Sequence, residues 1–79
     1  MKARVTVTLK PGVLDPQGAA IAAALATLGF EGVKGARQGK IIELDLDETD
    51  RARAEAAAAK MADTLLANQV IENYAVEVL

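Results

Sequence analysis

The sequence predicts an α+β fold: a two-layer α/β sandwich in which two helices cover one face of an antiparallel four-stranded sheet. Residues 3–9 and 40–46 alternate apolar and polar side chains, which is the period of a half-buried strand. Residues 16–28 and 50–67 repeat apolar side chains at helical spacing behind acidic residues suited to helix caps. The length of 79 residues indicates a single domain, residues 1–79.

The first strand and the first helix are delimited by local signals. Strand 3–9 ends at Pro11 and the glycine that follows it. Asp15 is the expected N-cap of the helix, because its carboxylate can accept hydrogen bonds from free backbone N–H groups. Pro16 suits the first helical position, where a missing N–H costs nothing. Gly29 is expected to end this helix.

The middle of the chain is expected to form a hairpin. Residues 33–37 indicate a weak strand, and Gln38-Gly39 indicates a turn. Residues 40–46 then form a strand in which Ile42, Leu44 and Leu46 face one side and Ile41, Glu43 and Asp45 face the other.

The second helix and the last strand complete the sequence of elements. The helix is expected to begin at a Thr49 or Asp50 cap, since acidic residues complement the N-terminus of a helix. It runs to about Ala67, with Asn68 as a plausible C-cap. Residues 70–78 form the last strand. The apolar stripe of this helix consists of Ala54, Ala57, Ala58, Met61 and Leu65.

The resulting order, βαββαβ, is typical of a ferredoxin-like two-layer sandwich. Each helix has one apolar stripe, so both are expected to cover the same sheet face. The opposite face carries charged side chains and threonines among small apolar residues. This mixed face is a candidate dimer surface.

The composition argues against a complete enzyme. The chain has no histidine, cysteine or serine, so it lacks the common side-chain nucleophiles and the imidazole general base. The usual ligands of zinc, iron–sulfur clusters and haem are missing for the same reason. We therefore expect no catalytic residue, and no metal or cofactor bound by this chain.

Charge and core size narrow the choice of partners. With a net charge of −2 and only Phe30 and Tyr74 as aromatics, the chain is poorly suited to nucleic acid. No apolar run is long enough to span a bilayer and no signal-peptide pattern opens the chain, which favours the cytoplasm. Alanine supplies 17 residues, so much of the apolar content consists of small side chains. Ordering the chain on folding costs about 1.5 kcal/mol of conformational free energy per residue. We expect the chain to gain further burial by self-association or by docking onto partners.

Three stretches carry a family resemblance: residues 9–18, 28–44 and 65–74. The most specific is residues 12–18, with the sequence GVLDPQG. In order, spacing and total length, these stretches resemble the PurS family, the small subunit of phosphoribosylformylglycinamidine (FGAM) synthase. The alanine-rich second helix departs most from the family pattern.

The resemblance implies a non-catalytic role in de novo purine (IMP) biosynthesis. The enzyme converts formylglycinamide ribonucleotide, ATP and glutamine to formylglycinamidine ribonucleotide, ADP, phosphate and glutamate. A large synthetase subunit binds ATP and Mg²⁺, and a glutaminase subunit releases ammonia. The PurS-like subunit, acting as a dimer or higher homo-oligomer, bridges the two and supports ammonia transfer.

The candidate partner interface lies in three segments: the 11–16 loop, the 38–40 turn and residues 68–74. An adaptor needs shaped loops more than reactive groups. These segments hold polar, glycine and proline residues that a bare scaffold does not require, although turn and cap chemistry is an alternative explanation. The candidate interface residues are Gly12, Asp15, Pro16, Gly39, Lys40, Asn68, Glu72 and Tyr74.

Other interpretations remain open. A small ligand-binding regulatory domain on a ferredoxin-like scaffold is the main alternative function. Residues 32–37 faintly resemble an acylphosphatase loop, but they follow the first helix instead of preceding it. Glycines 29–39 lack the strand–loop–helix context of a phosphate loop, and acidic residues 43–50 lack the pattern of a cation-binding loop. Turns and helix caps explain both of these segments more simply.

Overall fold

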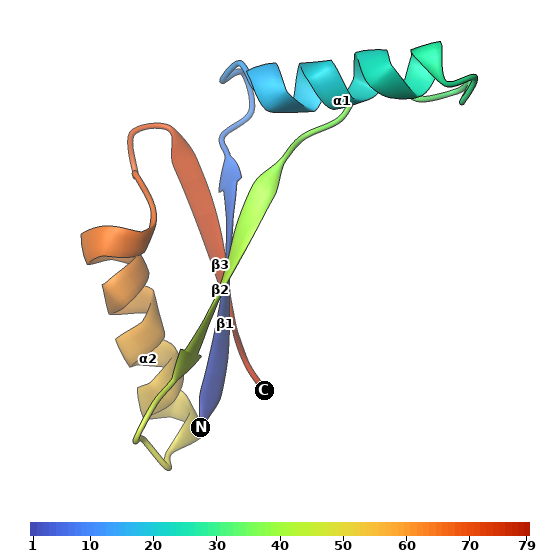
Figure 1. The fold of residues 1–79 in the computed structure, drawn as a ribbon. Coiled ribbons are helices and arrows are strands. Elements are labelled where there is room, and N and C mark those ends of the chain that lie inside the picture. Colours follow the sequence, from blue (N-terminus) through green and yellow to red (C-terminus); the bar gives the residue numbers. More distant parts are fainter.

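The computed structural model describes residues 1–79, and three strands alternate with helices along the chain (Figure 1). The elements are β1 (Lys2–Leu9), α1 (Pro16–Thr27), β2 (Gly39–Asp45), α2 (Arg51–Met61), the π-helical turn η1 (Ala62–Leu66) and β3 (Glu72–Val78). The three strands confirm the alternating patterns of the sequence to within two residues at each end.

The strands form one antiparallel sheet in the order β2-β1-β3. Val5 of β1 lies opposite Ile42 of β2 and Val76 of β3, so apolar side chains of all three strands share one face. Helix α2 packs along this face (Figure 1). The core between them is built largely from small side chains: Ala3, Val5, Val7, Ala58, Ala62 and Ala67.

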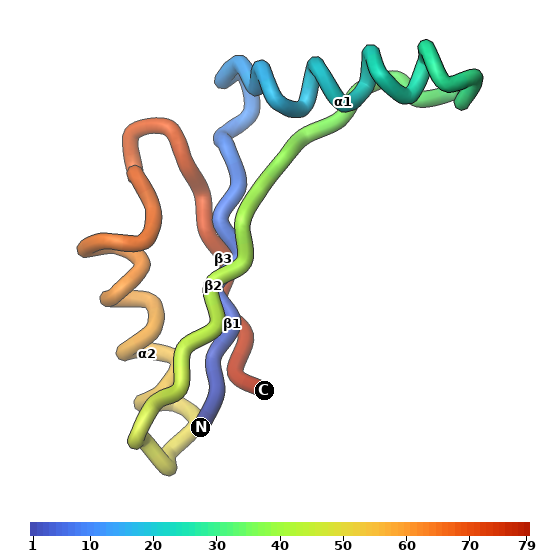
Figure 2. The backbone as a smooth tube through the Cα atoms, in the orientation of Figure 1, coloured from blue at the N-terminus to red at the C-terminus, as the bar shows by residue number.

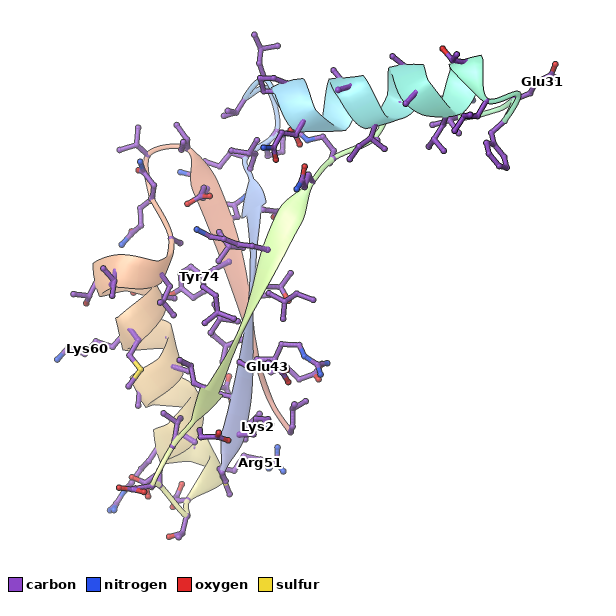
Figure 3. The ribbon with its side chains drawn as sticks, viewed as in Figure 1. Lys2, Glu31, Glu43, Arg51, Lys60 and Tyr74 are labelled. Carbon is purple, nitrogen blue, oxygen red and sulfur yellow. The ribbon has the colours of Figure 1, made fainter.

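The opposite sheet face is open and polar. Arg4 in the central strand lies 3.5 Å from Glu43 of β2 and 3.7 Å from Glu77 of β3. Figure 3 shows Glu43 on the side of the sheet away from α2. Such exposed pairs contribute at most about 1 kcal/mol each. Their main effect is to fill this face with paired charge.

The sheet has three strands, so the predicted four-stranded sheet is wrong. Residues 33–37 form no strand; instead the chain runs back beside α1 before it enters β2 (Figure 2). Glycine explains the difference, since Gly29 and Gly32 have φ near +90° and no alternating apolar pattern follows them. Gln38-Gly39 is therefore an entry into β2 and not a hairpin turn.

Helix α1 begins at its predicted cap but does not cover the sheet. It projects from the end of the sheet together with residues 28–38 (Figure 1), and Gly18 is its only buried residue. We call residues 16–38 the arm. Because of the arm, the radius of gyration is 15.8 Å, against about 12 Å for a compact chain of this length. The prediction that both helices cover one sheet face is therefore wrong for α1.

The second helix starts as predicted and ends differently. Asp50 caps it by accepting a hydrogen bond from the Arg53 N–H at 3.1 Å. The last turn widens, and the N–H of Ala67 donates to the carbonyl of Ala62, five residues back. This widening turns Leu65 outward, to 82% exposure, and makes Ala67 the C-cap in place of Asn68.

Candidate functional site

The three predicted interface segments meet at one end of the sheet. In an antiparallel sheet the end of β1 adjoins the starts of β2 and β3. Accordingly, Thr8 lies opposite Gly39, and Leu9 lies opposite Glu72. The loop after β1 is tied to the third segment by the Lys10 N–H, which donates to the Ile71 carbonyl at 2.8 Å.

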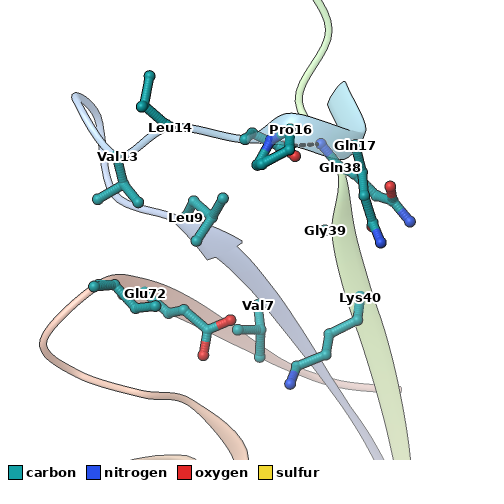
Figure 4. Close-up of a pocket in the computed structure, with 12 residues that line it drawn as sticks. Val7, Leu9, Val13, Leu14, Pro16, Gln17, Gln38, Gly39, Lys40 and Glu72 are labelled. Atoms are coloured by element: carbon teal, nitrogen blue, oxygen red, sulfur yellow. Dashed lines mark hydrogen bonds between the residues drawn. The ribbon is translucent and has the colours of Figure 1, made fainter. Parts of the chain in front are cut away.

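A groove of about 680 Å³ lies at this end, and we call it the end groove (Figure 4). Five of the eight predicted interface residues line it: Asp15, Pro16, Gly39, Lys40 and Glu72. Gly12, Asn68 and Tyr74 lie outside its lining. The apolar part of the lining consists of Val7, Leu9, Val13, Leu14 and Ile71. An apolar floor with a polar rim is the composition of a docking surface.

Asp15 holds the root of the arm together. One carboxylate oxygen accepts a hydrogen bond from the Gly18 N–H at 2.8 Å, which caps α1. The other accepts from the Gln38 N–H at 2.7 Å, which ties the returning chain to the start of the helix. The hydrogen bonds from Gln38 and Gly18, with the charge of Arg37, lower the pKa of Asp15. Both oxygens are engaged, so Asp15 positions the rim of the end groove.

Arg37 is a structural residue that sequence reasoning missed. Its guanidinium donates to the Val13 carbonyl at 2.8 Å and to the Lys10 carbonyl at 3.1 Å. These bonds fix the loop after β1, in which Gly12 has φ +87°, a conformation that favours glycine. The available signal was a charged side chain within the glycine-rich residues 32–39.

The rim opposite Asp15 is formed by Lys40 and by the turn before β3. The Glu72 carboxylate accepts from the Asn68 N–H at 2.7 Å, and the Asn68 side chain accepts from the Val70 N–H at 3.1 Å. These contacts close the turn. Lys40 extends across the end groove toward Glu72 (Figure 4). It forms no ion pair; the two ion pairs of the chain are both made by Arg4. Lys40 is therefore the one positive charge in the lining of this groove, and it has no ion-pair partner.

Tyr74 has a structural position. It lies opposite Val7 on the α2 side of the sheet, half-buried between the sheet and the helix (Figure 3). The Asp63 side chain nearby, together with desolvation, raises the pKa of Tyr74. The phenol therefore stays protonated at neutral pH.

Replacing Asp15 with asparagine is expected to lower stability at neutral pH and to flatten its pH dependence. The folded pKa of Asp15 lies below its unfolded value of 3.8. Its stabilisation is therefore complete well above pH 3.8 and is lost as the pH falls through the lower folded pKa. Urea midpoints at neutral and acid pH measure this. Asp15→Asn should differ from the parent at neutral pH and converge with it in acid.

The exposed Asp47, which accepts no hydrogen bond, provides the control. Asp47→Asn should keep the parent midpoint at neutral pH. Equal neutral midpoints for Asp15→Asn and the parent would show that the hydrogen bonds of Asp15 to Gly18 and Gln38 do not stabilise the fold.

The end groove brings no reactive set together. Across residues 1–79, no three acidic side chains are grouped so that they could hold a metal ion. None of the helices is both long enough and apolar enough to cross a membrane. The end groove offers a shaped surface with one positively charged side chain, Lys40, which has no ion-pair partner.

Comparison with known proteins decides the family. The family described as PurS, phosphoribosylformylglycinamidine (FGAM) synthase, matches residues 2–79. The chain belongs to the PurS family. The FGAM synthase subunit PurS of Synechocystis is 51% identical over 95% of this chain and 75% of its own length. That of Bacillus subtilis is 43% identical over 98% of this chain and 90% of its own.

Solved structures agree with the family assignment. The PurS subunit of Thermotoga maritima superimposes with a TM-score of 0.89 at 32% identity, over 99% of this chain and 90% of its own. A chain in the structure of PurLQS from Thermotoga maritima superimposes with a TM-score of 0.88 at 33% identity, over 99% of this chain and 95% of its own length. The resemblance seen in residues 9–18, 28–44 and 65–74 is thus confirmed. PurS is a small subunit of FGAM synthase, a ligase complex of purine biosynthesis.

Proposed function

We propose that this chain bridges the synthetase and glutaminase subunits of FGAM synthase and supports the transfer of ammonia between them. The observation that carries the proposal is the match to PurS over residues 2–79, together with the similarity to a chain of a PurLQS complex. ATP and Mg²⁺ belong to the large synthetase subunit in this proposal. The chain itself acts as a homo-oligomer in the cytoplasm.

The chemistry of ammonia gives the bridge its purpose. Ammonia released into water at neutral pH is mostly protonated and is then no longer a nucleophile. Holding two active sites in register raises the effective concentration of ammonia at the second site. A bridge of this kind needs no nucleophile or general base of its own.

The end groove is the proposed contact with one of these subunits. Both carboxylate oxygens of Asp15 and one of Glu72 accept hydrogen bonds within the chain, so these residues shape the surface. The groups left for a partner are the Lys40 ammonium and exposed apolar side chains such as Leu14, which is 88% exposed. A partner with a carboxylate beside an apolar protrusion fits this lining.

Reconstitution with the matching synthetase and glutaminase subunits tests the function. Omitting this chain should abolish glutamine-dependent product formation while a high ammonium concentration restores it, because only the transfer step is lost. If both activities are indifferent to the chain, the bridging proposal is wrong.

Lys40→Glu tests the end groove within the same assay. Reversing the free charge should lower the apparent affinity for the partner subunit by about tenfold or more, as loss of a charge pair at an interface does. Arg53→Glu reverses an exposed charge at the start of α2, outside the end groove, and should leave the affinity unchanged. Equal affinities of the two variants for the partner subunit would show that Lys40 is not part of the interface.

A further inference from the structure

Helix α2 covers only part of the apolar face of the sheet. It packs mainly against β1 and β3, and the buried strand residues Ala3, Val5 and Val7 all belong to β1. On the same face of the edge strand β2, Ile42 and Leu44 are only half-buried. A second helix is the usual cover for this part of a sheet, but here α1 projects away from it (Figure 1). The place beside α2 is therefore left without a second helix.

An apolar groove of about 560 Å³ marks this place, between α2 and β2. We call it the α2 groove, and it is lined by Leu44, Ala57, Lys60, Met61, Thr64, Leu65 and Leu66. The π-helical turn η1 turns Leu65 outward, to 82% exposure, and Met61 is 40% exposed. Such turns are frequent at functional sites, and methionine adapts its shape to a bound partner. The α2 groove thus presents apolar side chains that the core of this chain does not use.

Lys60 gives the α2 groove its charge. It is the only charged residue of the lining, and it has no ion-pair partner, since both ion pairs of the chain are made by Arg4. Figure 3 shows Lys60 on the side of α2 that faces away from the sheet. An apolar surface with one unpaired ammonium at its edge complements an apolar surface that carries a carboxylate.

The arm does not supply this complement. In the same chain it is held away from the α2 groove, because Asp15 and Arg37 anchor its root at the end of the sheet. Helix α1, in this chain or in a second copy, contains no charged side chain, so it offers Lys60 no carboxylate. The charge of the α2 groove therefore fits a different protein.

We propose that the α2 groove binds an amphipathic helix with an acidic residue beside its apolar stripe, supplied by the partner subunit that does not occupy the end groove. A helix completes the layer beside α2, at the spacing of about 8–10 Å between packed helices. A bridge needs two separate contacts, and the two grooves share no lining residue. The proposal rests on the proposed function, because it divides the two subunits between the two grooves.

Titration of variants into the reconstituted complex tests the α2 groove. The chain concentration that gives half-maximal glutamine-dependent product formation should rise about tenfold for Lys60→Glu, because this change sets two carboxylates against each other. For Leu65→Ala it should rise about fivefold, through the loss of an apolar contact. The matched controls are Lys2→Glu and Val70→Ala, which change exposed residues outside both grooves and should leave the titration unchanged. Circular dichroism checks that each variant is folded.

Site-specific cross-linking in the assembled complex identifies the occupant without an activity readout. The chain has no cysteine, so one introduced cysteine carries a photoreactive benzophenone at a chosen position. From Leu65→Cys, in the α2 groove, the label should cross-link to one subunit. From Leu14→Cys, in the end groove, it should cross-link to the other. Mass spectrometry should place the Leu65→Cys cross-link in a helical segment that carries apolar and acidic residues.

The failures of the two proposals are distinguishable. If the parent chain supports glutamine-dependent activity and both Lys60→Glu and Leu65→Ala match it, the α2 groove is not a docking site, while the bridging function stands. Cross-links from both positions to the same subunit overturn the proposal, and so does a cross-link from Leu65→Cys to a second copy of this chain. If the activity is indifferent to the parent chain itself, the bridging function and the proposal fail together.

Discussion

Ala58→Asp is expected to destabilise the protein by about 3–5 kcal/mol, the cost of an uncompensated buried charge. Ala58 is completely buried between α2 and the sheet, among alanines and valines that offer a carboxylate no partner. Since small domains have only about 5–15 kcal/mol of stability in total, this change removes much of it. Urea denaturation followed by far-ultraviolet circular dichroism measures the loss.

The same helix supplies the control. Ala56 is exposed, so Ala56→Asp introduces the same side chain into water and should cost about 0.7 kcal/mol or less through helix propensity alone. Similar losses for the two variants would show that the layer between α2 and the sheet is not the core of this protein.

Gly18→Ala is the second change with a large expected effect, and its sign is the reverse of the usual one. Replacing glycine by alanine inside a helix normally stabilises it by about 1 kcal/mol. At Gly18, however, a Cβ would overlap the Ala36 carbonyl oxygen and lie 2.9 Å from an oxygen of Asp15. Relieving the overlap must separate the two sides of the arm at its root. Overpacking of this kind costs about 1–3 kcal/mol.

Gly35→Ala tests the same substitution where there is room. No atom lies within 4 Å of a Cβ at Gly35, and its φ is not positive. Gly35→Ala should therefore be neutral or slightly stabilising in thermal denaturation, while Gly18→Ala lowers the midpoint. A Gly18→Ala midpoint at or above that of the parent would refute the close packing at the root.

Capping residues and alternating strands were predictable because their signals are local. Asp15 caps α1 through a hydrogen bond to a residue three positions away, and Asp50 caps α2 in the same way. In β1, each residue of the pattern faces its side of the sheet as alternation requires. The family resemblance likewise depends on short stretches whose order and spacing are visible without coordinates.

The candidate interface residues lie partly together in the structure, and their role in binding a partner stays a prediction. Five of its eight residues line the end groove, because the ends of antiparallel strands bring distant loops together. The sequence did not indicate that the carboxylates of Asp15 and Glu72 are engaged within the chain, nor that Lys40 is free. Those distinctions depend on hydrogen bonds that no pattern of residue types specifies.

The sequence by itself determined the helices, the three strands, the absence of common nucleophiles and the family. Only the tertiary structure decided that residues 33–37 form no strand and that α1 projects as an arm. The reason is the range of the interactions. Arg37 bonds to carbonyls 24 and 27 positions away, and Asp15 to a backbone N–H 23 positions away. Periodicity describes neighbours along the chain, whereas the direction of the arm depends on contacts between residues that are distant in sequence.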